Sequence, residues 1–303
     1  MISTYLYGMK KITIIGAGTM GNGIAHVFAI HGFNVKLFDI HKESLDRAIK
    51  TIEKNMSRQV EKGILTATEA ESSIGNIELI NELNLAVESA DLVIEAATEN
   101  EDLKTEIFKE ISNLVSSDTI LATNTSSISI GKIAAISKHP ENVIGMHFMN
   151  PVPVMKLVEI ISGYKTSIKT KETVENLSKK LGKIPVSCND YPGFVANRIL
   201  MPMINESIQC LQNGVAGVAE IDSIMKLGMS HPMGPLQLAD FIGLDVCLSI
   251  LNVLHKGFGD SKYSPNPVLV NLVTAGDIGV KSGKGFYDYS NGLKNPTVSY
   301  RNN

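Results

Sequence analysis

The pattern of apolar and polar positions along the chain changes near residue 190. Before that point, short apolar runs alternate with stretches of helical spacing, and the runs cover 11–15, 35–38, 91–97, 119–123, 143–147, 156–161 and 184–187. Runs of this length between turn residues are typical of strands buried in a parallel sheet. We therefore predict an α/β domain over residues 9–190.

The strand pattern stops at the turn signal Tyr191-Pro192-Gly193. Beyond it, apolar residues recur at helical spacing over 194–213, 219–227, 236–254 and 267–275. These stretches predict an all-helical domain over residues 191–303. The helix at 194–213 is strongly apolar for its length, and such helices often bury a second face against a partner. We therefore expect a homodimer or higher homo-oligomer through this domain.

The first strand leads directly into a glycine-rich motif. Lys11–Ile15 is followed by Gly16-x-Gly18-x-x-Gly21 and then by an amphipathic helix, which is the context of a dinucleotide-binding fingerprint. Gly16 allows the tight turn, Gly18 lets the backbone approach a pyrophosphate, and Gly21 lets helix and strand pack closely. The helix N-terminus offers N–H groups to the same pyrophosphate. The α/β domain is therefore predicted to be of the Rossmann type, with a mostly parallel sheet.

An acidic residue ends the second strand at the spacing of a ribose ligand. Asp39 lies 23 positions after Gly16 (39 − 16), close to the spacing of about 20 residues seen in such domains. A carboxylate there accepts hydrogen bonds from the ribose hydroxyls of NAD and repels the 2′-phosphate of NADP, so NAD is the predicted cofactor. The alternative is that Asp39 only caps the helix that begins near Lys42.

Two helices follow Asp39 where a simple strand crossover would need one. The first is predicted over about 43–62, and Thr66-x-x-Glu69 is a capping box that starts the second. We interpret the pair as a helical hairpin inserted in the nucleotide-binding domain. Its basic residues include Arg58 and Lys62; they either form a solvated face or meet the phosphates of a large substrate.

Composition narrows the functional classes. A length of 303 residues suits two domains, and 44% hydrophobic residues suffice for two cores. The net charge of −3 gives no sign of a nucleic-acid surface, and no apolar run approaches the roughly 20 residues of a membrane span. Three widely spaced cysteines suggest neither disulfides nor a metal site, and point to the cytoplasm. Residues 1–8 do not resemble a signal peptide and are interpreted as an extension or tag before Met9.

Four polar residues are candidates for chemistry: Ser126, His147 and Glu159 in the first domain, and Asn197 in the second. Oxidation of an alcohol needs a base for the hydroxyl proton, and histidine suits that task. A carboxylate such as Glu159 would fix its tautomer. The alternatives are a structural histidine, a Glu159–Lys156 pair, and Ser126 as a helix N-cap. A hydrolase triad is disfavoured because no G-x-S-x-G surrounds Ser126. The residues alone predict an NAD-dependent dehydrogenase with His147 as its base.

Between Met9 and Tyr289 the chain resembles the short-chain L-3-hydroxyacyl-CoA dehydrogenases, and among them the bacterial 3-hydroxybutyryl-CoA dehydrogenases. The segments that carry the resemblance begin with the glycine motif and continue with Asn124-Thr-Ser-Ser127, Ile144-Gly-Met-His-Phe-Met-Asn-Pro151, Pro153-Val-Met-Lys-Leu-Val-Glu159, Tyr191-Pro-Gly-Phe-Val-Ala-Asn-Arg198, His231-Pro-Met-Gly-Pro235, Asp240-Phe-Ile-Gly-Leu-Asp245, Gly259-Asp-Ser-Lys-Tyr263 and Lys281-Ser-Gly-Lys-Gly-Phe-Tyr287.

The resemblance implies roles for individual residues. It implies His147 as catalytic base paired with Glu159, and Ser126 and Asn197 as residues that hold the substrate. The positions where the family contacts the cofactor are Gly16, Gly18, Thr19, Met20, Gly21, Asp39, Glu99, Lys104, Ser126 and Asn150. It also implies that the helical hairpin binds CoA, with Asn55, Arg58 and Lys62 as its substrate contacts.

The implied reaction is the reversible NAD-dependent oxidation of (S)-3-hydroxybutyryl-CoA to acetoacetyl-CoA, within butanoate and fatty acid metabolism. Met149 stands where the family usually has Phe, and Val280 where it has Arg; these departures leave the size of the acyl pocket and the packing near the C-terminus undetermined. Two other classes stay open: a dehydrogenase of free hydroxy acids or sugar acids with the same architecture, and a non-catalytic protein that has kept the fold.

Overall fold

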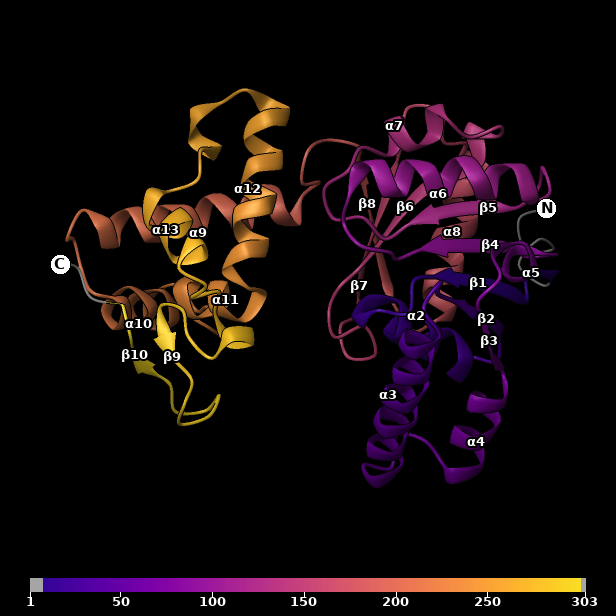
Figure 1. The fold of residues 1–303 in the computed structure, drawn as a ribbon, viewed down its shortest axis with the longest axis horizontal. Helices are drawn as coiled ribbons and strands as arrows, with labels where there is room; N and C mark the ends of the chain where they lie inside the picture. Colours follow the sequence, from indigo (N-terminus) through magenta and orange to yellow (C-terminus); the bar gives the residue numbers. More distant parts are fainter. Residues whose placement is uncertain (1–7, 301–303) are drawn as a thin grey trace. The chain divides into compact units, whose positions relative to one another are not determined.

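A computed structural model describes residues 8–300, so residues 1–7 of the expected extension lie outside the described part. The chain forms two compact units, one ending at Tyr191 and the other beginning at Pro192 (Figure 1). The change from strand to helix patterning in the sequence falls at the same place. Each unit is built around its own hydrophobic core.

The first unit is organised by one sheet with the strand order β3-β2-β1-β4-β5-β6-β7-β8. In the described part of the chain every neighbouring pair is parallel except β6 and β7. The strands are β1 (Lys11–Ile15), β2 (Asn34–Phe38), β3 (Ile77–Ile80), β4 (Leu92–Glu95), β5 (Ile120–Thr123), β6 (Val143–Phe148), β7 (Leu157–Ser162) and β8 (Ile184–Asn189). The predicted Rossmann-type sheet is therefore confirmed.

Helices cover both faces of this sheet. Phe28 of α2 and Leu177 of α8 belong to one core cluster with Ile12 and Ile14 of β1, so these two helices share a face. In Figure 1, α6 and α7 lie together over the part of the sheet that contains β4 to β6. The helices are α2 (Thr19–Ile30), α3 (Lys42–Glu61), α4 (Ala67–Gly75), α5 (Leu83–Val87), α6 (Glu101–Leu114), α7 (Ile130–Ala135) and α8 (Ile168–Lys180), with a short 3-10 helix at Pro140–Asn142.

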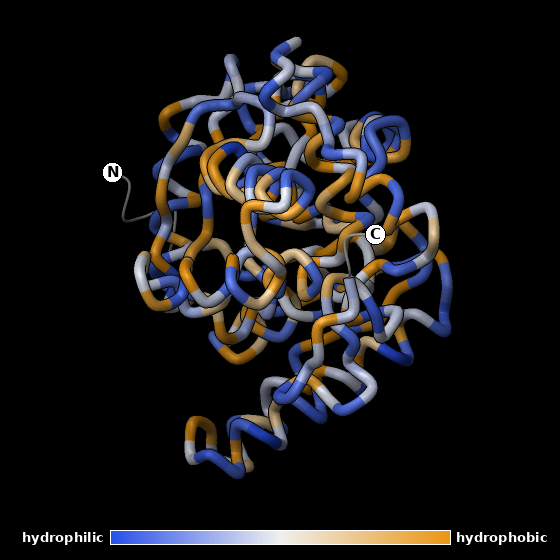
Figure 2. The backbone as a smooth tube through the Cα atoms, turned by 90° about the vertical axis from the view of Figure 1, so that its left-hand side faces the viewer, coloured by the Kyte–Doolittle hydropathy of each residue, from blue (hydrophilic) through white to orange (hydrophobic). Residues whose placement is uncertain are grey.

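The helical hairpin is formed by α3 and α4. Thr66 accepts the Glu69 N–H and Glu69 accepts the Thr66 N–H, so the predicted capping box is present. Hydrophilic residues with spaced hydrophobic ones run along the hairpin (Figure 2), and Ile52 and Met56 are the buried ones near its middle. Strand β3 directly follows the hairpin and extends the sheet beyond β2; the sequence pattern did not indicate it.

The second unit is helical, apart from a small strand pair. Its elements are α9 (Ala196–Gln212), α10 (Val218–Gly228), α11 (Pro235–Ile242), α12 (Leu244–Phe258), α13 (Pro267–Thr274), 3-10 helices at Ser261–Tyr263 and Val280–Ser282, and the strands β9 (Tyr287–Asp288) and β10 (Thr297–Val298). The single helix expected over 236–254 is wrong. Gly243 adopts φ of 101°, and α11 and α12 meet there at 96°.

No single helix within residues 8–300 is long and apolar enough to cross a membrane. The bent pair α11 and α12 meets the length and composition requirement only when the two helices are taken together.

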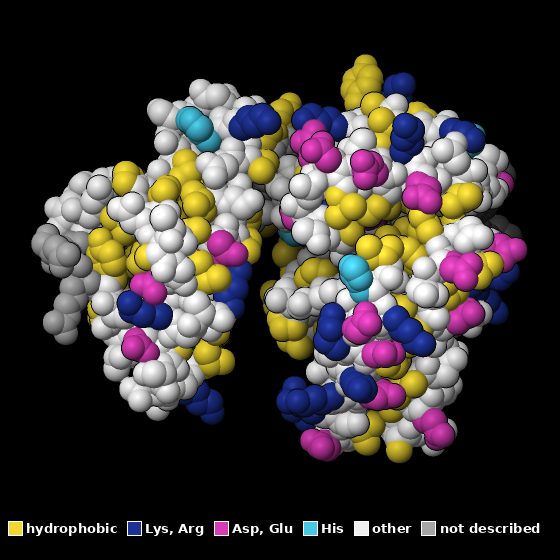
Figure 3. All heavy atoms as spheres, in the orientation of Figure 1, with side chains coloured by type: hydrophobic (Ala, Val, Ile, Leu, Met, Phe, Trp, Pro, Cys, Tyr) yellow, Lys and Arg dark blue, Asp and Glu magenta, His cyan; other side chains and the backbone are white. Residues whose placement is uncertain are grey.

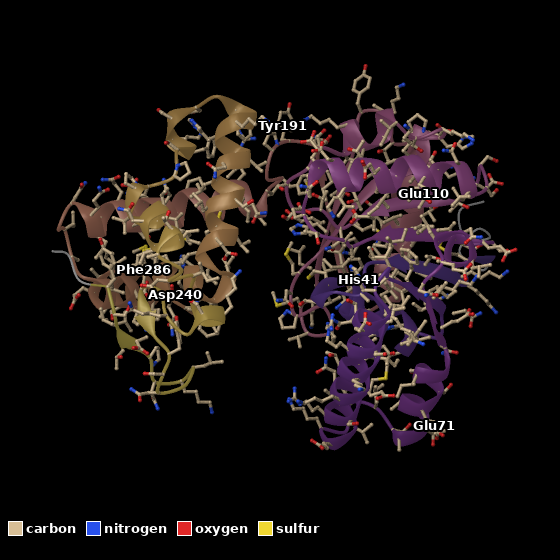
Figure 4. The ribbon with its side chains drawn as sticks, in the orientation of Figure 1. His41, Glu71, Glu110, Tyr191, Asp240 and Phe286 are labelled. Atoms are coloured by element: carbon tan, nitrogen blue, oxygen red, sulfur yellow. The ribbon has the colours of Figure 1, made fainter. Side chains whose placement is uncertain are left out.

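Two buried carboxylates fasten the C-terminal segment of this unit. Asp240 accepts the N–H groups of Phe286 at 3.0 Å and Tyr287 at 2.9 Å, and the hydroxyl of Tyr289 at 3.1 Å; Asp240 and Phe286 lie side by side in Figure 4. Asp222 likewise accepts the Tyr287 hydroxyl at 2.8 Å. Burial raises the pKa of Asp240 to about 6, although these donors oppose the shift.

We expect Asp240→Asn to lower the free energy of unfolding by about 2–3 kcal/mol at pH 7.5, where the wild-type carboxyl is ionised. The substitution puts an amide NH₂ against a buried N–H group that has lost its acceptor. Urea denaturation measures the change. The control Asp288→Asn alters a half-buried acid of the same segment and keeps an oxygen for the Ser290 N–H, so it should change stability far less. Equal stability of Asp240→Asn and wild type would contradict the assigned role.

Candidate active site

The pairing of β6 with β7 sets His147 directly opposite Glu159. Residues directly opposite in an antiparallel pair project from the same face of the sheet. The His147 Nδ1 atom lies 2.7 Å from Oε2 of Glu159. His147 is 8% exposed and Glu159 is 4% exposed, so the contact is largely shielded from water. Two residues twelve positions apart in the sequence thus form one buried pair.

This contact defines the chemistry of the imidazole. A carboxylate only accepts hydrogen bonds, so the proton of the pair lies on Nδ1 when Glu159 is ionised. The lone pair of a neutral ring is then on Nε2, and the carboxylate can stabilise the positive charge when Nε2 accepts a proton. The alternative pairing of Glu159 with Lys156 is not the one observed. The arrangement can exchange a proton with a bound hydroxyl or carbonyl group.

Two further contacts hold the end of β6 and the loop after it. The Asn124 side chain accepts the N–H of Phe148 at 2.9 Å. Lys183, which is 8% exposed, donates to the carbonyl oxygens of Val152 and Met155. These carbonyls belong to the connection between β6 and β7. Neither contact was indicated by the sequence, where the lysine before β8 has no distinguishing pattern.

The glycine loop between β1 and α2 has the geometry of a pyrophosphate site. Gly16 adopts φ of 100°, and a Cβ atom there would lie 2.7 Å from the Ala96 oxygen. A Cβ on Gly21 would lie 1.7 Å from the Gly16 oxygen, whereas one on Gly18 would meet nothing within 4 Å. Gly16 and Gly21 therefore serve close packing, and Gly18 leaves the backbone open to a ligand. Helix α2 begins here with no side-chain cap on its N-terminus, which favours an anion.

Asp39 lies at the end of β2 beside this loop. Its carboxylate accepts the N–H of Ala17 at 2.9 Å and that of His41 at 3.0 Å. The N-cap of α3 is His41, with no side-chain cap bond. The alternative in which Asp39 is the cap of that helix is therefore wrong. Its position against the glycine loop fits the hydroxyls of a ribose.

A cavity of about 740 Å³ extends from the glycine loop across the ends of β1, β2 and β4. Its apolar wall includes Leu103 and Ile107, and its acidic residues are Asp39, Glu106 and Glu110; no Lys or Arg occurs among the described residues that line it. Figure 4 labels Glu110 on α6 and His41 at the start of α3, two of the residues that line it. The cavity therefore fits an adenosine and disfavours an added phosphate, as in NADP.

Ser126 belongs to a second group of polar residues, at the carboxyl ends of β4 and β5. Glu99 accepts hydrogen bonds from the Thr125 hydroxyl at 2.6 Å, the Ser126 N–H at 2.9 Å and the Ser127 hydroxyl at 2.9 Å. The alternative of Ser126 as a helix N-cap is wrong, because α7 is capped by Ser129. Glu99 thus fixes the backbone of the segment that carries Ser126.

Beneath Glu99 lies an ion pair that the sequence did not indicate. Lys104 is 1% exposed and Glu95 is 0% exposed, and their Nζ and Oε1 atoms are 2.6 Å apart. The Lys104 ammonium also lies 3.4 Å from Glu99. The available signal was a glutamate ending the otherwise apolar run Leu92-Val-Ile-Glu95, because such a residue needs a buried partner. The expected cofactor contact of Lys104 stays a prediction.

The other predicted site residues are spread over both units. Asn150 is exposed in the connection after β6, and Asn197 is half-buried at the start of α9. On α3, Asn55 is half-buried, and Arg58 and Lys62 at its end are exposed. Lys and Arg side chains gather over the hairpin, interspersed with acidic ones (Figure 3). Within residues 8–300, no three His, Cys, Asp or Glu side chains are grouped to hold a metal ion.

Comparisons with known proteins find relatives over nearly the whole chain. Residues 11–191 match the family model described as 3-hydroxyacyl-CoA dehydrogenase, NAD binding domain, and residues 193–289 match the C-terminal domain of the same family. The chain is 54% identical over 281 residues to a probable 3-hydroxybutyryl-CoA dehydrogenase of Bacillus subtilis, covering 93% of this chain and 98% of that protein. It is 49% identical over 289 residues to the 3-hydroxybutyryl-CoA dehydrogenase of Bradyrhizobium diazoefficiens, with 95% and 98% covered.

A solved structure is similar to this chain in both fold and sequence. The crystal structure of (S)-3-hydroxybutyryl-CoA dehydrogenase from Ralstonia eutropha is similar to this chain with a TM-score of 0.90 at 47% sequence identity, covering 93% of this chain and 100% of that one.

We expect Asp39→Ser to narrow the discrimination between the two nicotinamide cofactors. Removal of the carboxylate beside the ribose removes repulsion of a 2′-phosphate, so the ratio Kd(NADPH)/Kd(NADH) should fall roughly tenfold or more. Fluorescence titration measures both constants. The control Asp46→Ser removes an exposed acid of α3 and should leave the ratio within about twofold. A ratio unchanged by Asp39→Ser would show that the ribose is held elsewhere.

Proposed function

The chain belongs to the 3-hydroxyacyl-CoA dehydrogenase family, and from that premise we propose that it interconverts (S)-3-hydroxybutyryl-CoA and acetoacetyl-CoA. The proposal takes its substrate from relatives that are 49–54% identical to this chain over more than nine-tenths of its length. The observation that carries the mechanism is the buried contact between His147 and Glu159 at the carboxyl end of β6. A non-catalytic role is disfavoured, because burial of an imidazole and a carboxylate costs desolvation energy that an apolar pair would not.

The protein is an NAD-dependent oxidoreductase. The first unit carries the NAD-binding domain of the family, and the glycine loop, Asp39 and the adjoining cavity fit the cofactor. When bound, NAD⁺ supplies the hydride acceptor for alcohol oxidation, and NADH supplies the donor for the reverse reaction.

In this mechanism His147 exchanges the proton. In the oxidative direction, Nε2 accepts the proton of the 3-hydroxyl group while C3 loses its hydride. Glu159 holds Nδ1–H and stabilises the imidazolium ion that results. In the reductive direction the imidazolium returns the proton to the oxygen. Burial of the pair strengthens its attraction, because little water competes for either partner.

Ser126 and Asn197 are proposed to hold the substrate oxygen atoms. Ser126 lies on a segment whose backbone is fixed by Glu99, so its hydroxyl can be oriented before the substrate arrives. Asn197 is the second residue of α9, which follows the turn at Gly193, where φ is 71°. An amide side chain can donate to a thioester or keto oxygen.

The CoA moiety is proposed to bind the hairpin of α3 and α4. Arg58 lies in the last turn of α3 and Lys62 is its C-cap, both with exposed side chains, and Asn55 lies one turn before Arg58. The positive charges of Arg58 and Lys62 suit the phosphates of CoA. The acidic residues around them keep this basic surface local, in agreement with the net charge of −3 for the whole chain. A substrate without CoA would make no use of this surface.

We further propose that the second unit mediates assembly into a homodimer or higher homo-oligomer. Its helices and adjoining turns expose large apolar side chains, among them Ile199 at 68%, Leu227 at 87% and Met229 at 60%. Such residues are typical of surfaces covered by a partner. The enzyme is proposed to act in the cytoplasm, in short-chain fatty acid and butanoate metabolism.

We expect His147→Gln to lower kcat for acetoacetyl-CoA reduction by ~10²–10⁴-fold, because glutamine cannot carry the transferred proton. The affinity for NADH should stay within about threefold of wild type. Absorbance at 340 nm gives the rate, and fluorescence titration gives the affinity.

The matched control is His139→Gln, at a half-exposed histidine that lies near Glu141 in the same unit. It should keep at least half of the wild-type rate. A His147→Gln enzyme with more than one-tenth of the wild-type kcat would contradict the proposed base. Turnover of hydroxy acids without CoA, at rates equal to those with CoA esters, would contradict the proposed substrate.

A further inference from the structure

Two carboxylates share one ammonium group at the carboxyl end of β4. The Lys104 Nζ atom lies 2.6 Å from Glu95 and 3.4 Å from Glu99. Lys104 and Glu95 are almost completely buried, whereas the Glu99 side chain is 37% exposed. One ammonium is enough to neutralise one carboxylate. When all three groups are ionised, this cluster of Glu95, Lys104 and Glu99 therefore has a net charge of −1.

Three hydrogen-bond donors surround the carboxyl group of Glu95. It accepts the Ala97 N–H at 2.6 Å, the Thr123 hydroxyl at 2.7 Å and the Lys104 ammonium at 2.6 Å. In each contact the partner donates the hydrogen bond, which suits a carboxylate because a carboxylate only accepts.

Glu99 is ionised as well. Burial raises the pKa of Glu99, but the Lys104 charge and the hydrogen bonds from Thr125, Ser126 and Ser127 outweigh it and bring the pKa below its ordinary value. With Lys104 paired to Glu99, the surplus negative charge of the cluster is the one that Glu95 adds.

The sheet topology places the cluster of Glu95, Lys104 and Glu99 on the side of the site where the nicotinamide half of a dinucleotide would bind. A dinucleotide spans the crevice where the strand order reverses, which here is the boundary between β1 and β4. Asp39 marks the adenosine half on the β1–β2 side. The nicotinamide half then extends over the ends of β4, β5 and β6, where the cluster and His147 lie. Charged groups at the same strand ends and helix starts include the His147–Glu159 pair and the exposed Lys132–Glu101 pair.

The nicotinamide ring bears a positive charge in NAD⁺ and none in NADH. A fixed negative charge in a poorly solvated region therefore favours the oxidised form. We propose that Glu95 is a specificity-determining residue that raises the affinity for NAD⁺ relative to NADH, through the surplus negative charge of the cluster with Lys104 and Glu99. The inference rests on the NAD site and holds for any substrate of the enzyme.

The test compares the ratio Kd(NADH)/Kd(NAD⁺) in wild type and Glu95→Gln, measured by fluorescence titration and calorimetry at low salt without any acyl-CoA. Glutamine keeps the shape of Glu95 and an oxygen for the Ala97 N–H and Lys104, but lacks the charge. We expect the ratio to fall about 3- to 20-fold, mainly through weaker binding of NAD⁺.

Two control variants separate charge from structure. Thr123→Val removes the hydroxyl that donates to Glu95 and accepts the Thr125 N–H, and it keeps the charge of Glu95. Glu101→Gln removes an exposed charge from the start of α6. Both should leave the ratio within about twofold.

If Glu95→Gln does not fold, Glu99→Gln removes the same unit of charge from the exposed end of the cluster and should shift the ratio in the same direction.

An unchanged ratio in a folded charge-removing variant would overturn the proposal, and so would an equal shift in Thr123→Val. A failure to turn over acetoacetyl-CoA would contradict the proposed function but not this proposal, because the binding constants are measured without substrate.

Discussion

The antiparallel register between β6 and β7 is the constraint on which the site depends. Every other neighbouring pair in the described sheet is parallel, so the reversal of β7 is what brings Glu159 back along β6 to face His147. A slip of one residue would turn Glu159 to the opposite face of the sheet. The connection between the two strands is correspondingly well held, since Lys183 binds the carbonyl oxygens of Val152 and Met155.

The same sheet places the cofactor-binding and catalytic residues along one edge, at the carboxyl ends of its strands. The ends of β1 and β2 carry the glycine loop and Asp39, and the ends of β4, β5 and β6 carry Glu99, Ser126 and His147. Parallel strands make this possible because their carboxyl ends fall together. Charged groups below this edge are buried, but each is surrounded by partners, as Glu95 is by an ammonium, a hydroxyl and an N–H group. Buried charges whose hydrogen bonds are all made hold a site rigid and determine its electric field.

Much of this arrangement could be predicted from local patterns. The apolar run at Lys11–Ile15 and the glycines after it determine a strand, a turn and a helix within twenty residues, so no distant contact is needed to identify them. The capping box at Thr66 is equally local. Local patterns were not enough to predict the His147–Glu159 pair, because only the register of two strands brings these residues together. Its prediction relied on the chemistry that a histidine needs and on the family resemblance.

Other features depend on tertiary structure that a local pattern does not contain. The bend at Gly243 was missed because the apolar residues on both sides keep a helical spacing, although the glycine takes a conformation that breaks the helix. Strand β3 has four residues of mixed exposure and therefore no distinctive pattern. The roles of Glu95 and Lys183 became visible only when their partners, distant in sequence, were in place.

The central claim is that the imidazole of His147, held by Glu159, meets the reacting oxygen of the substrate beside the nicotinamide. A crystal structure of the complex with NAD⁺ and acetoacetyl-CoA tests it most directly. The account predicts the 3-keto oxygen within about 3.2 Å of Nε2 of His147, with Nδ1 still bonded to Glu159. A substrate oxygen more than about 5 Å from the ring, or an imidazole that has left Glu159 and turned away from the cofactor, would contradict it.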